Sequence, residues 1–303
     1  MKPPAKLYKY CPFNVYSLRA INEAEIFHAS PQQFNDPLDC SPTLDLDVST
    51  DDAIKLLCGM LELSGETLGR IEQKIRSLRY SATEFWEDEP DTQEAQDARL
   101  RWSLGRDILS TLRSEMATFG VLSLSETYSS VLMWSHYGDH HRGLCLEYDT
   151  SLLPVPTLEP VAYRAPRAIR AHDLMRWKLE GNSDSEKRVR QTYFHAKSEE
   201  WAYEREWRDI SHRVGVNTLN FKLSAIHFGL RTDLTVQQTI VKALARDRDI
   251  ELFSMWAKDD SFKLERSLVE RDYFEQTGIR QPPFIIFGTR LIDPPTDNVG
   301  GEN

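Results

Sequence analysis

FHAKSEEWAYEREWRDI, residues Phe194–Ile210, combines four glutamates with three lysines or arginines, two tryptophans and a tyrosine. Alternation in its centre, YEREWR, predicts a strand, which we place at residues 204–210. With a period of two, one face of this strand carries two carboxylates and a guanidinium, from Glu204, Glu206 and Arg208. The opposite face carries Tyr203, Arg205 and Trp207. Because such a charged face is costly to bury without partners, the stretch predicts either an edge strand with a solvated face or a functional site.

The composition predicts a folded, acidic protein. Of the 303 residues, 40% are hydrophobic and 10% aromatic, which is enough to bury a core in one large domain or about two smaller ones. A formal net charge of −10 argues against binding nucleic acid through a global positive field, although a local basic groove stays open. No apolar run approaches the roughly 18–20 residues of a membrane helix, and the N-terminal MKPPAKLYKYCPF lacks the apolar segment of a signal peptide. Four scattered cysteines without a CxxC pair fit a reducing compartment, so we expect a cytoplasmic protein without a membrane partner.

Periodicity along the chain predicts short strands interleaved irregularly with helices. The expected strands are residues 7–10, 25–29, 120–125, 144–149, 161–163, 204–210, 224–229, 251–257 and 262–269. Helices are expected after the N-caps Asn14 and Ser129 or Ser130, after a capping box at Thr235, and over most of residues 164–200. This order predicts an α+β fold whose mixed, mainly antiparallel sheets form a central cleft, rather than a doubly wound parallel sheet.

The domain organisation depends on a helical block in residues 51–118. Its apolar stripes and its Leu, Glu, Arg and Ala content predict a helical insertion, with a polar, solvated connection at 83–97. The α+β core domain then comprises residues 1–50 and 119–290. Residues 291–303 are expected to form a flexible tail.

The loop FNDPLD, residues 34–39, is rich in turn formers. Pro37 restricts Asp36 to extended geometry, and the side chains of Asn35 and Asp36 can bond neighbouring backbone amides. The loop is therefore either an ordered turn pinned by Phe34 or a polar loop beside a ligand.

Polar residues also gather near MWSHY, residues 133–137. His136 and His140 have the four-residue spacing of a two-histidine metal site on a helix, but Gly138 lies between them and no Glu follows His136, so we expect no metal. The alternative is a polar helix end in which His136 and Tyr137 are bonded in a partly buried turn. A serine nucleophile is not indicated, because Ser123 and Ser125 lack the Gly-x-Ser-x-Gly turn.

Basic residues concentrate between positions 164 and 190, in an otherwise acidic chain. They are Arg164, Arg167, Arg170, Arg176, Lys178, Lys187, Arg188 and Arg190. The concentration indicates either a solvated helix face or a docking face for an anionic partner.

Four phrases of the chain form a familiar set. They are LYKY at 7–10, FNDPLD at 34–39, LS at 124–125 with MWSHY at 133–137 and GLCLEYD at 143–149, and Lys197 with Trp201, YE at 203–204 and EWR at 206–208. The set resembles the uncharacterised bacterial family called domain of unknown function 2971. The resemblance spans roughly residues 7–262, with the helical block as a variable insertion, and it implies no particular activity.

The order of these elements is also similar to that of ADP-ribosyltransferases. Both have a first strand with Leu-Tyr and a polar residue, a capped helix, a short strand, a serine-bearing strand and a late Glu-x-Glu strand, and the opening resembles the DNA-modifying branch of those toxins. The resemblance implies NAD as the substrate. It implies that Lys9 or Tyr10 helps to seat NAD, that Ser123 or Ser125 lines the nicotinamide cleft, and that Glu206 is the catalytic glutamate with Glu204 as its partner. Lys9 stands where that fold normally has His or Arg.

These residues suit the chemistry of breaking the nicotinamide–ribose bond. The reaction builds positive charge on the ribose, which a carboxylate stabilises while it orients or deprotonates an acceptor. An ion pair with Arg208 could hold Glu204 while Glu206 acts. Cationic donors for the NAD phosphates would be Lys9, Lys197 and Arg208. Aromatic walls for nicotinamide or an acceptor base would be Tyr10, Trp134 and Tyr203.

The sequence leaves three functions open. The first is an NAD-dependent ADP-ribosyltransferase-like enzyme of a toxin or phage-defence type, with a nucleic-acid or protein acceptor. The second is a non-catalytic nucleotide-binding or sensor module that uses the same residues. The third is a hydrolase or nuclease-like enzyme that uses Asp36, Asp39, His136 and Glu206. If Lys9, Ser125, Trp134 or His136, and Glu206 converge on one cleft, a functional site is favoured.

Overall fold

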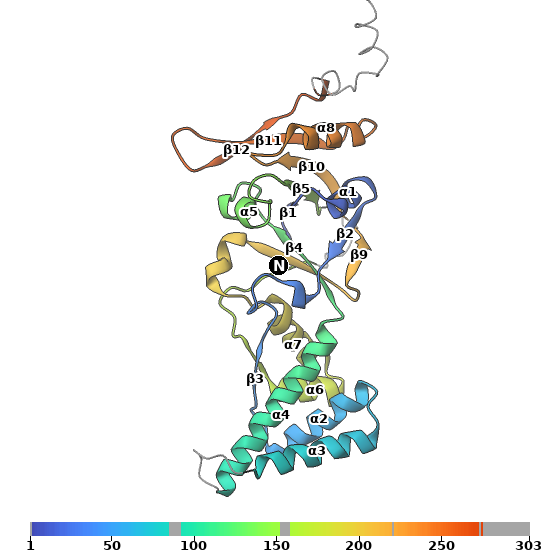
Figure 1. The fold of residues 1–303 in the computed structure, drawn as a ribbon, viewed down its shortest axis with the longest axis vertical. Coiled ribbons are helices and arrows are strands. Elements are labelled where there is room, and N and C mark those ends of the chain that lie inside the picture. Colours follow the sequence, from blue (N-terminus) through green and yellow to red (C-terminus); the bar gives the residue numbers. More distant parts are fainter. Residues whose placement is uncertain (1, 85–91, 152–157, 220, 273, 275–303) are drawn as a thin grey trace, which may run out of the picture.

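A computed structural model of the chain describes residues 2–84, 92–151, 158–219, 221–272 and 274 (Figure 1). The helices are α1 (Val15–Asn22), α2 (Thr50–Leu63), α3 (Leu68–Ala82), α4 (Gln93–Met116), α5 (Val131–His136), α6 (Ala171–Glu180), α7 (Ser183–His195) and α8 (Leu234–Ala243), with 3-10 helices η1 (Pro31–Gln33) and η2 (Glu199–Glu204). The strands are β1 (Lys6–Cys11), β2 (Glu25–His28), β3 (Thr43–Asp45), β4 (Gly120–Ser125), β5 (Leu144–Asp149), β6 (Glu159–Pro160), β7 (Ala168–Arg170), β8 (Glu206–Ser211), β9 (Gly215–Thr218), β10 (Lys222–Phe228), β11 (Glu251–Ala257) and β12 (Leu264–Leu268). The predicted α+β fold class is confirmed.

The largest sheet has eight strands in the order β12-β11-β10-β5-β1-β4-β8-β6. Its neighbours are antiparallel except for the parallel pair β10–β11, so it is mainly antiparallel as predicted. β1 pairs with β5 along its whole length, from Lys6↔Asp149 to Cys11↔Leu144, but it pairs with β4 only at Tyr8↔Ser125. Beyond this point β1 and β4 are not paired to one another. We call the opening between them the β1–β4 gap.

Apolar side chains of strands and helices pack together in a separate cluster on each side of the large sheet. On one side of the sheet, Leu7 and Ile226 pack with Ala20 of α1 and Val241 of α8. On the other side, Tyr8 and Tyr10 of β1 pack with Met133 and Trp134 of α5, among others. Fully burying a Leu, Ile or Phe side chain stabilises a fold by about 1.5–3 kcal/mol, so these contacts fix the position of β1 from both sides.

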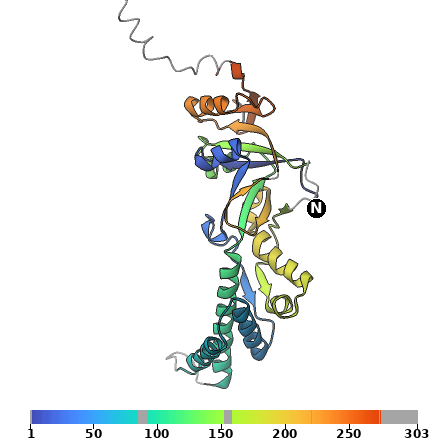
Figure 2. The same cartoon turned by 90° about the vertical axis from the view of Figure 1, so that its right-hand side faces the viewer.

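A third apolar cluster joins α2, α3 and α4 to α6 and α7. Of these helices, α2, α3 and α4 lie at the opposite end of the elongated molecule from β10–β12 and α8, and α7 lies between that end and the large sheet (Figures 1 and 2). The cluster also includes Cys40, Phe119 and Val121 from outside the helical block. The division into a core of 1–50 and 119–290 and an insertion of 51–118 stays a prediction. The expected tail, 291–303, lies outside the described residues.

Several local predictions are confirmed. Asn14 caps α1, because its Oδ1 accepts the backbone N–H groups of Tyr16 and Ser17 at 2.9 and 3.1 Å. Ser130 caps α5, since its side chain accepts from the backbone nitrogen of Met133 at 3.3 Å. Among the described residues, no helix combines the length and the apolar content needed to cross a membrane.

Other local predictions are wrong, and the first concerns the stretch Phe194–Ile210. Residues Glu199–Glu204 form the 3-10 helix η2, Arg205 takes the left-handed conformation with φ 47°, and the strand begins only at Glu206. A polar alternation is compatible with either structure, and a single left-handed residue is enough to turn a helix end into a strand.

The remaining differences are at the ends of elements. The expected polar connection at 83–97 overlaps α4, which begins at Gln93 behind its cap Thr92. The helix expected at the Thr235 capping box is instead capped by Asp233, which accepts the backbone N–H of Thr235 at 2.7 Å. The expected strand 161–163 lies at 159–160 instead, and the short parallel pair β3–β7 and the strand β9 were not predicted.

Candidate functional site

A cavity of about 510 Å³ lies at the β1–β4 gap. Ten of the residues predicted from the sequence line it: Lys9, Tyr10, Asn35, Ser123, Ser125, His136, Tyr137, Lys197, Glu204 and Glu206. They come from β1, the loop after η1, β4, the end of α5, the segment between α7 and η2, η2 itself and β8, which are far apart in the sequence. Because cavities of roughly 300–1,000 Å³ hold small molecules, this space is large enough for a nucleotide-sized ligand.

Two other predicted residues are buried away from the lining. Trp134 is fully buried, donates from Nε1 to the Tyr128 carbonyl at 2.8 Å, and packs edge-on against Tyr10 with ring centroids 5.2 Å apart. It supports the cavity wall from behind and does not offer a stacking face. Arg208, predicted as a phosphate donor, is also fully buried.

The last two predicted residues, Asp36 and Tyr203, lie among aromatic rings next to the lining. The Asp36 carboxylate accepts from Trp201 Nε1 at 2.8 Å. The Tyr203 ring lies 5.9 Å from the ring of Trp201 and 6.5 Å from that of His136. The side chain of Asp36 therefore fastens the FNDPLD loop to η2, and it is not free to act on a ligand.

Arg208 binds two carboxylates at once. Its Nε and Nη2 donate to Oε1 and Oε2 of Glu206 at 2.8 and 2.9 Å. Its Nη1 and Nη2 donate to Oδ1 and Oδ2 of Asp39 at 3.0 and 2.6 Å. Nη1 also donates to the Phe194 carbonyl at 2.6 Å. Both carboxylate pairs are bidentate, the geometry in which a guanidinium binds most strongly.

Lys197 lies at the centre of the same network. Its Nζ is 2.5 Å from Glu204 Oε2, 3.0 Å from Glu206 Oε2 and 3.3 Å from Asp39 Oδ2. The side chains of all four residues are 4–5% exposed. The interpretation of Glu204, Glu206 and Arg208 as a solvated edge is therefore wrong. Three carboxylates and two cations form one buried network.

The two glutamates differ in their proton affinity. Burial raises the pKa of Glu206, but the charges of Arg208 and Lys197 outweigh burial and hold this pKa well below its ordinary range. For Glu204, burial outweighs the opposing charge of Lys197, and the neighbouring Glu206 adds to it, so the pKa is raised. The expected pairing of Arg208 with Glu204 is wrong, because Arg208 holds Glu206. Glu204 is the carboxyl that is better suited to exchange a proton.

Hydroxyl groups hold Glu204 from the cavity side. The Tyr137 hydroxyl donates to Glu204 Oε1 at 2.7 Å and accepts from Asn35 Nδ2 at 3.4 Å. Ser125 Oγ donates to the Glu204 backbone carbonyl at 2.7 Å. Burial and the charge of Glu204 raise the pKa of Tyr137, so its hydroxyl stays protonated and keeps donating.

Tyr163 is a site residue that the sequence analysis missed. Its hydroxyl accepts the backbone N–H of Glu206 at 2.7 Å, which fixes the start of β8. The contact joins residues 43 positions apart, and Tyr163 belongs to no recognisable motif. Nothing in the sequence alone signals this role.

A metal site is not formed by the histidines. α5 ends at His136, and His140 lies in a turn in which Asp139, His140 and His141 all have positive φ, so the two histidines do not share a helix. Within the described part of the chain, no three His, Cys, Asp or Glu side chains are arranged as metal ligands. Of the residues in the hydrolase hypothesis, Asp39, His136 and Glu206 line the cavity and Asp36 does not.

Most of the basic residues between 164 and 190 are paired with carboxylates of the protein. The pairs are Arg164–Glu199, Arg170–Asp47, Arg176–Glu180, Lys178–Glu115, Arg188–Asp173 and Arg190–Glu186. Pairing of this kind favours the solvated helix face over a docking face for an anionic partner.

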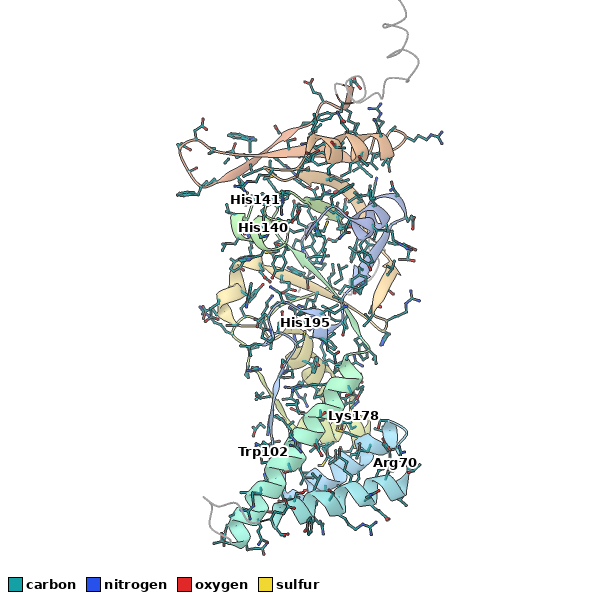
Figure 3. The ribbon with its side chains drawn as sticks, viewed as in Figure 1. Arg70, Trp102, His140, His141, Lys178 and His195 are labelled. Carbon is teal, nitrogen blue, oxygen red and sulfur yellow. The ribbon has the colours of Figure 1, made fainter. Side chains whose placement is uncertain are left out.

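His195, beside the charged network, predicts an acid-sensitive fold. The side chain lies between the strands and the lower helices (Figure 3), and neither ring nitrogen has a hydrogen-bond partner among the described residues. Burial, together with the charge of Arg208, lowers its pKa from 6.5 to about 4. Between these values the unfolded chain binds a proton that the folded protein excludes, so stability is complete above pH 6.5 and falls as the pH drops toward 4. The total loss is up to about 3 kcal/mol.

Urea denaturation of His195→Phe between pH 4 and 7 checks this expectation. The variant should show a shallower dependence of the unfolding free energy on pH than the natural protein. His140→Gln, which changes an exposed histidine, is the matched control and should leave the slope unchanged. Equal slopes for His195→Phe and the natural protein would contradict the assignment.

Comparison with known proteins bears on this same region. Residues 133–208 match the model of a family described as "Protein of unknown function (DUF2971)". The match runs from MWSHY to Arg208 and so includes most of α5 together with Lys197, Glu204 and Glu206. Neither the curated proteins nor the solved structures gave a significant match to the chain. The predicted resemblance to this family is confirmed over residues 133–208.

Proposed function

We propose that the cavity at the β1–β4 gap binds NAD, or a closely related nucleotide, and that the Glu204–Glu206 pair promotes cleavage of its nicotinamide–ribose bond. One observation carries the proposal. Ten residues predicted from the sequence, spread from Lys9 to Glu206, line a single cavity, and two of them, Glu204 and Glu206, are buried carboxylates whose pKa values move in opposite directions. In enzymes, two carboxyl groups with different pKa values usually take two roles. The group with the lower pKa stays ionised and stabilises positive charge, and the group with the higher pKa exchanges a proton.

In the proposed reaction, Glu206 supplies a fixed negative charge. As the bond from ribose C1′ to the nicotinamide nitrogen breaks, its electron pair moves to the cationic pyridinium ring, and positive charge develops on the ribose. Because Arg208 and Lys197 keep Glu206 ionised and immobile, its charge needs no rearrangement to stabilise the ribose.

Glu204 exchanges the proton of the acceptor. The acceptor forms the new bond to C1′, and its proton moves to the ionised Glu204 carboxylate, whose raised pKa makes it the stronger base of the pair. Water as the acceptor would make the protein an NAD glycohydrolase. A nucleic-acid or protein nucleophile would make it an ADP-ribosyltransferase. Tyr137 and Lys197 hold the two oxygens of Glu204 at 2.7 and 2.5 Å, so its orientation is set before the ligand binds.

A second candidate function is nucleotide binding without turnover. It is favoured by the engagement of both Glu206 oxygens, which already accept from Arg208 and Lys197. In that case the network would serve only to shape the cavity, and the ligand would be held by the hydroxyl groups and aromatic rings of the lining.

Incubation with NAD and chromatographic detection of nicotinamide tests the proposal. We expect release from NAD but not from NADH, because the reduced ring carries no positive charge and is a poor leaving group. Stabilisation by NAD in a thermal shift, without nicotinamide, would support the binding module instead. Neither release nor stabilisation by NAD would overturn both.

A further inference from the structure

We propose that Lys9 is a nucleophilic amine that forms an imine with a small aldehyde or ketone bound in the cavity. This activity goes beyond the cleavage of NAD and does not depend on it. It rests on the surroundings of Lys9, which differ from those of the other lysine in the cavity lining.

Lys9 has no carboxylate partner. It lies on β1, lines the cavity, and its Nζ donates to the Ser123 carbonyl across the β1–β4 gap at 3.0 Å. Within the described ranges no Asp or Glu oxygen lies within 4.0 Å of this Nζ, whereas Lys197 has three such neighbours. Lys9 is thus held by one neutral acceptor, which an amine without its extra proton can also satisfy.

The carboxylates that could neutralise Lys9 are already bound to other cations. Glu206 accepts from Arg208 and Lys197, and Glu204 accepts from Lys197. Burial is the main influence on Lys9 and lowers its pKa, while Glu206, Glu204 and Cys11 oppose it. The Cys11 thiol has a pKa of about 12, so near pH 7 it carries no charge that would favour the ammonium form.

Other titratable groups face the same cavity from the surrounding elements. They are Tyr8 and Tyr10 on β1, Tyr16 on α1, Asp39 after η1, His136 and Tyr137 at the end of α5, and Lys197 before η2. Asp39 is bound to Arg208, and Lys197 is a cation, so neither stabilises a second positive charge at Lys9. A desolvated lysine of this kind is the usual source of imine-forming amines in proteins.

The chemistry is balanced by groups that are present. The Lys9 lone pair attacks the carbonyl carbon, and the carbonyl oxygen takes up a proton to give a carbinolamine. Loss of this oxygen as water, together with the remaining proton of the amine nitrogen, leaves the carbon–nitrogen double bond. Glu204 lines the same cavity with a raised pKa, so its carboxylate can take up the proton that the amine nitrogen loses and pass it to the departing oxygen. No oxidant or cofactor is required.

The lining also indicates the ligand class. Tyr10, Tyr16, Phe27 and Phe34 contribute aromatic surface, and Lys9, Ser123 and Asn35 contribute polar groups. A cavity of this composition fits a carbonyl compound with a flat or apolar body and its carbonyl group near Lys9.

Reductive trapping tests the proposal directly. The whole protein is treated at pH 7 with a limiting amount of benzaldehyde and cyanoborohydride, and the benzylated lysines are located by peptide mass mapping. We expect Lys9 to react at least about tenfold faster than Lys55, because a larger share of its amine is unprotonated at this pH. Lys55 is the matched control, because it is exposed and Asp52 raises its pKa.

Two further measurements make the result unambiguous. The labelling rate of Lys9 should reach its plateau at a lower pH than that of Lys55, and Lys9→Arg, which keeps a donor for the Ser123 carbonyl, should remove the cavity adduct only. Labelling of Lys9 at the rate of Lys55 or more slowly would overturn the proposal. Because the mapping uses the natural protein and no NAD, its outcome is independent of the folding of the variant and of nicotinamide release.

Discussion

Replacing Arg208 by methionine should lower the free energy of unfolding by at least about 3 kcal/mol. Arg208 is fully buried and neutralises both Glu206 and Asp39. Methionine fills a similar space but supplies no charge and no donor. Two buried carboxylates are then left to share Lys197, and removing one partner of a buried ion pair strands the other charge in a medium that solvates it poorly. Urea denaturation followed by tryptophan fluorescence at pH 7 measures the change.

Arg164→Met is the matched control for Arg208→Met. Arg164 also pairs with a glutamate, Glu199, but its side chain is 81% exposed, so its loss should cost less than about 1 kcal/mol. Arg208→Lys should fall between the two variants, because one ammonium cannot bind two carboxylates in a bidentate manner. Similar small losses for Arg208→Met and Arg164→Met would show that the network adds little to stability.

Replacing Glu204 by glutamine should lower nicotinamide release by about 10²–10⁴-fold while the protein stays folded. Glutamine has nearly the shape of glutamate and keeps an acceptor for Tyr137 or Lys197, but it cannot take up the proton of the acceptor. It also removes one of three buried negative charges that face two cations, so we expect the melting temperature to change little. The readouts are the rate of nicotinamide release and a thermal unfolding curve.

Two controls separate this effect from a loss of structure. Glu199→Gln changes an exposed glutamate of the same 3-10 helix and should leave the rate unchanged. Glu206→Gln should lower both rate and stability, because it breaks the pair with Arg208. A folded Glu204→Gln variant that releases nicotinamide at the natural rate would exclude Glu204 as the base and return the role to another residue.

The elements around the cavity could largely be predicted from short-range patterns. The alternation of side-chain types along the sequence predicts the strands β1 and β4, and the capping side chain of Asn14 predicts the start of α1. These signals depend on neighbours one to four positions apart, which is the range over which backbone geometry and capping operate. The same patterns placed most of the candidate residues on elements that proved to meet.

The network itself could not be predicted in this way. Asp39 and Arg208 are 169 positions apart in the sequence. Their bidentate pair forms only because the loop after η1 packs against β8, and no short-range pattern predicts this packing. The left-handed conformation of Arg205 has no signature in a residue that is neither glycine nor asparagine. The predicted strand ran through Arg205 and still placed Glu204 and Glu206 on one face. It paired Arg208 with Glu204, however, whereas Arg208 binds Glu206.

β1 is paired unequally with its two neighbouring strands, and this determines how the wall of the cavity is held. On one side, the strand is joined to β5 along its whole length, and on the other its backbone pairs with β4 at Tyr8 and Ser125 only. The width of the opening is therefore set by side chains that bridge it, such as Lys9, whose Nζ donates to the Ser123 carbonyl at 3.0 Å, and not by a backbone hydrogen-bond ladder between β1 and β4.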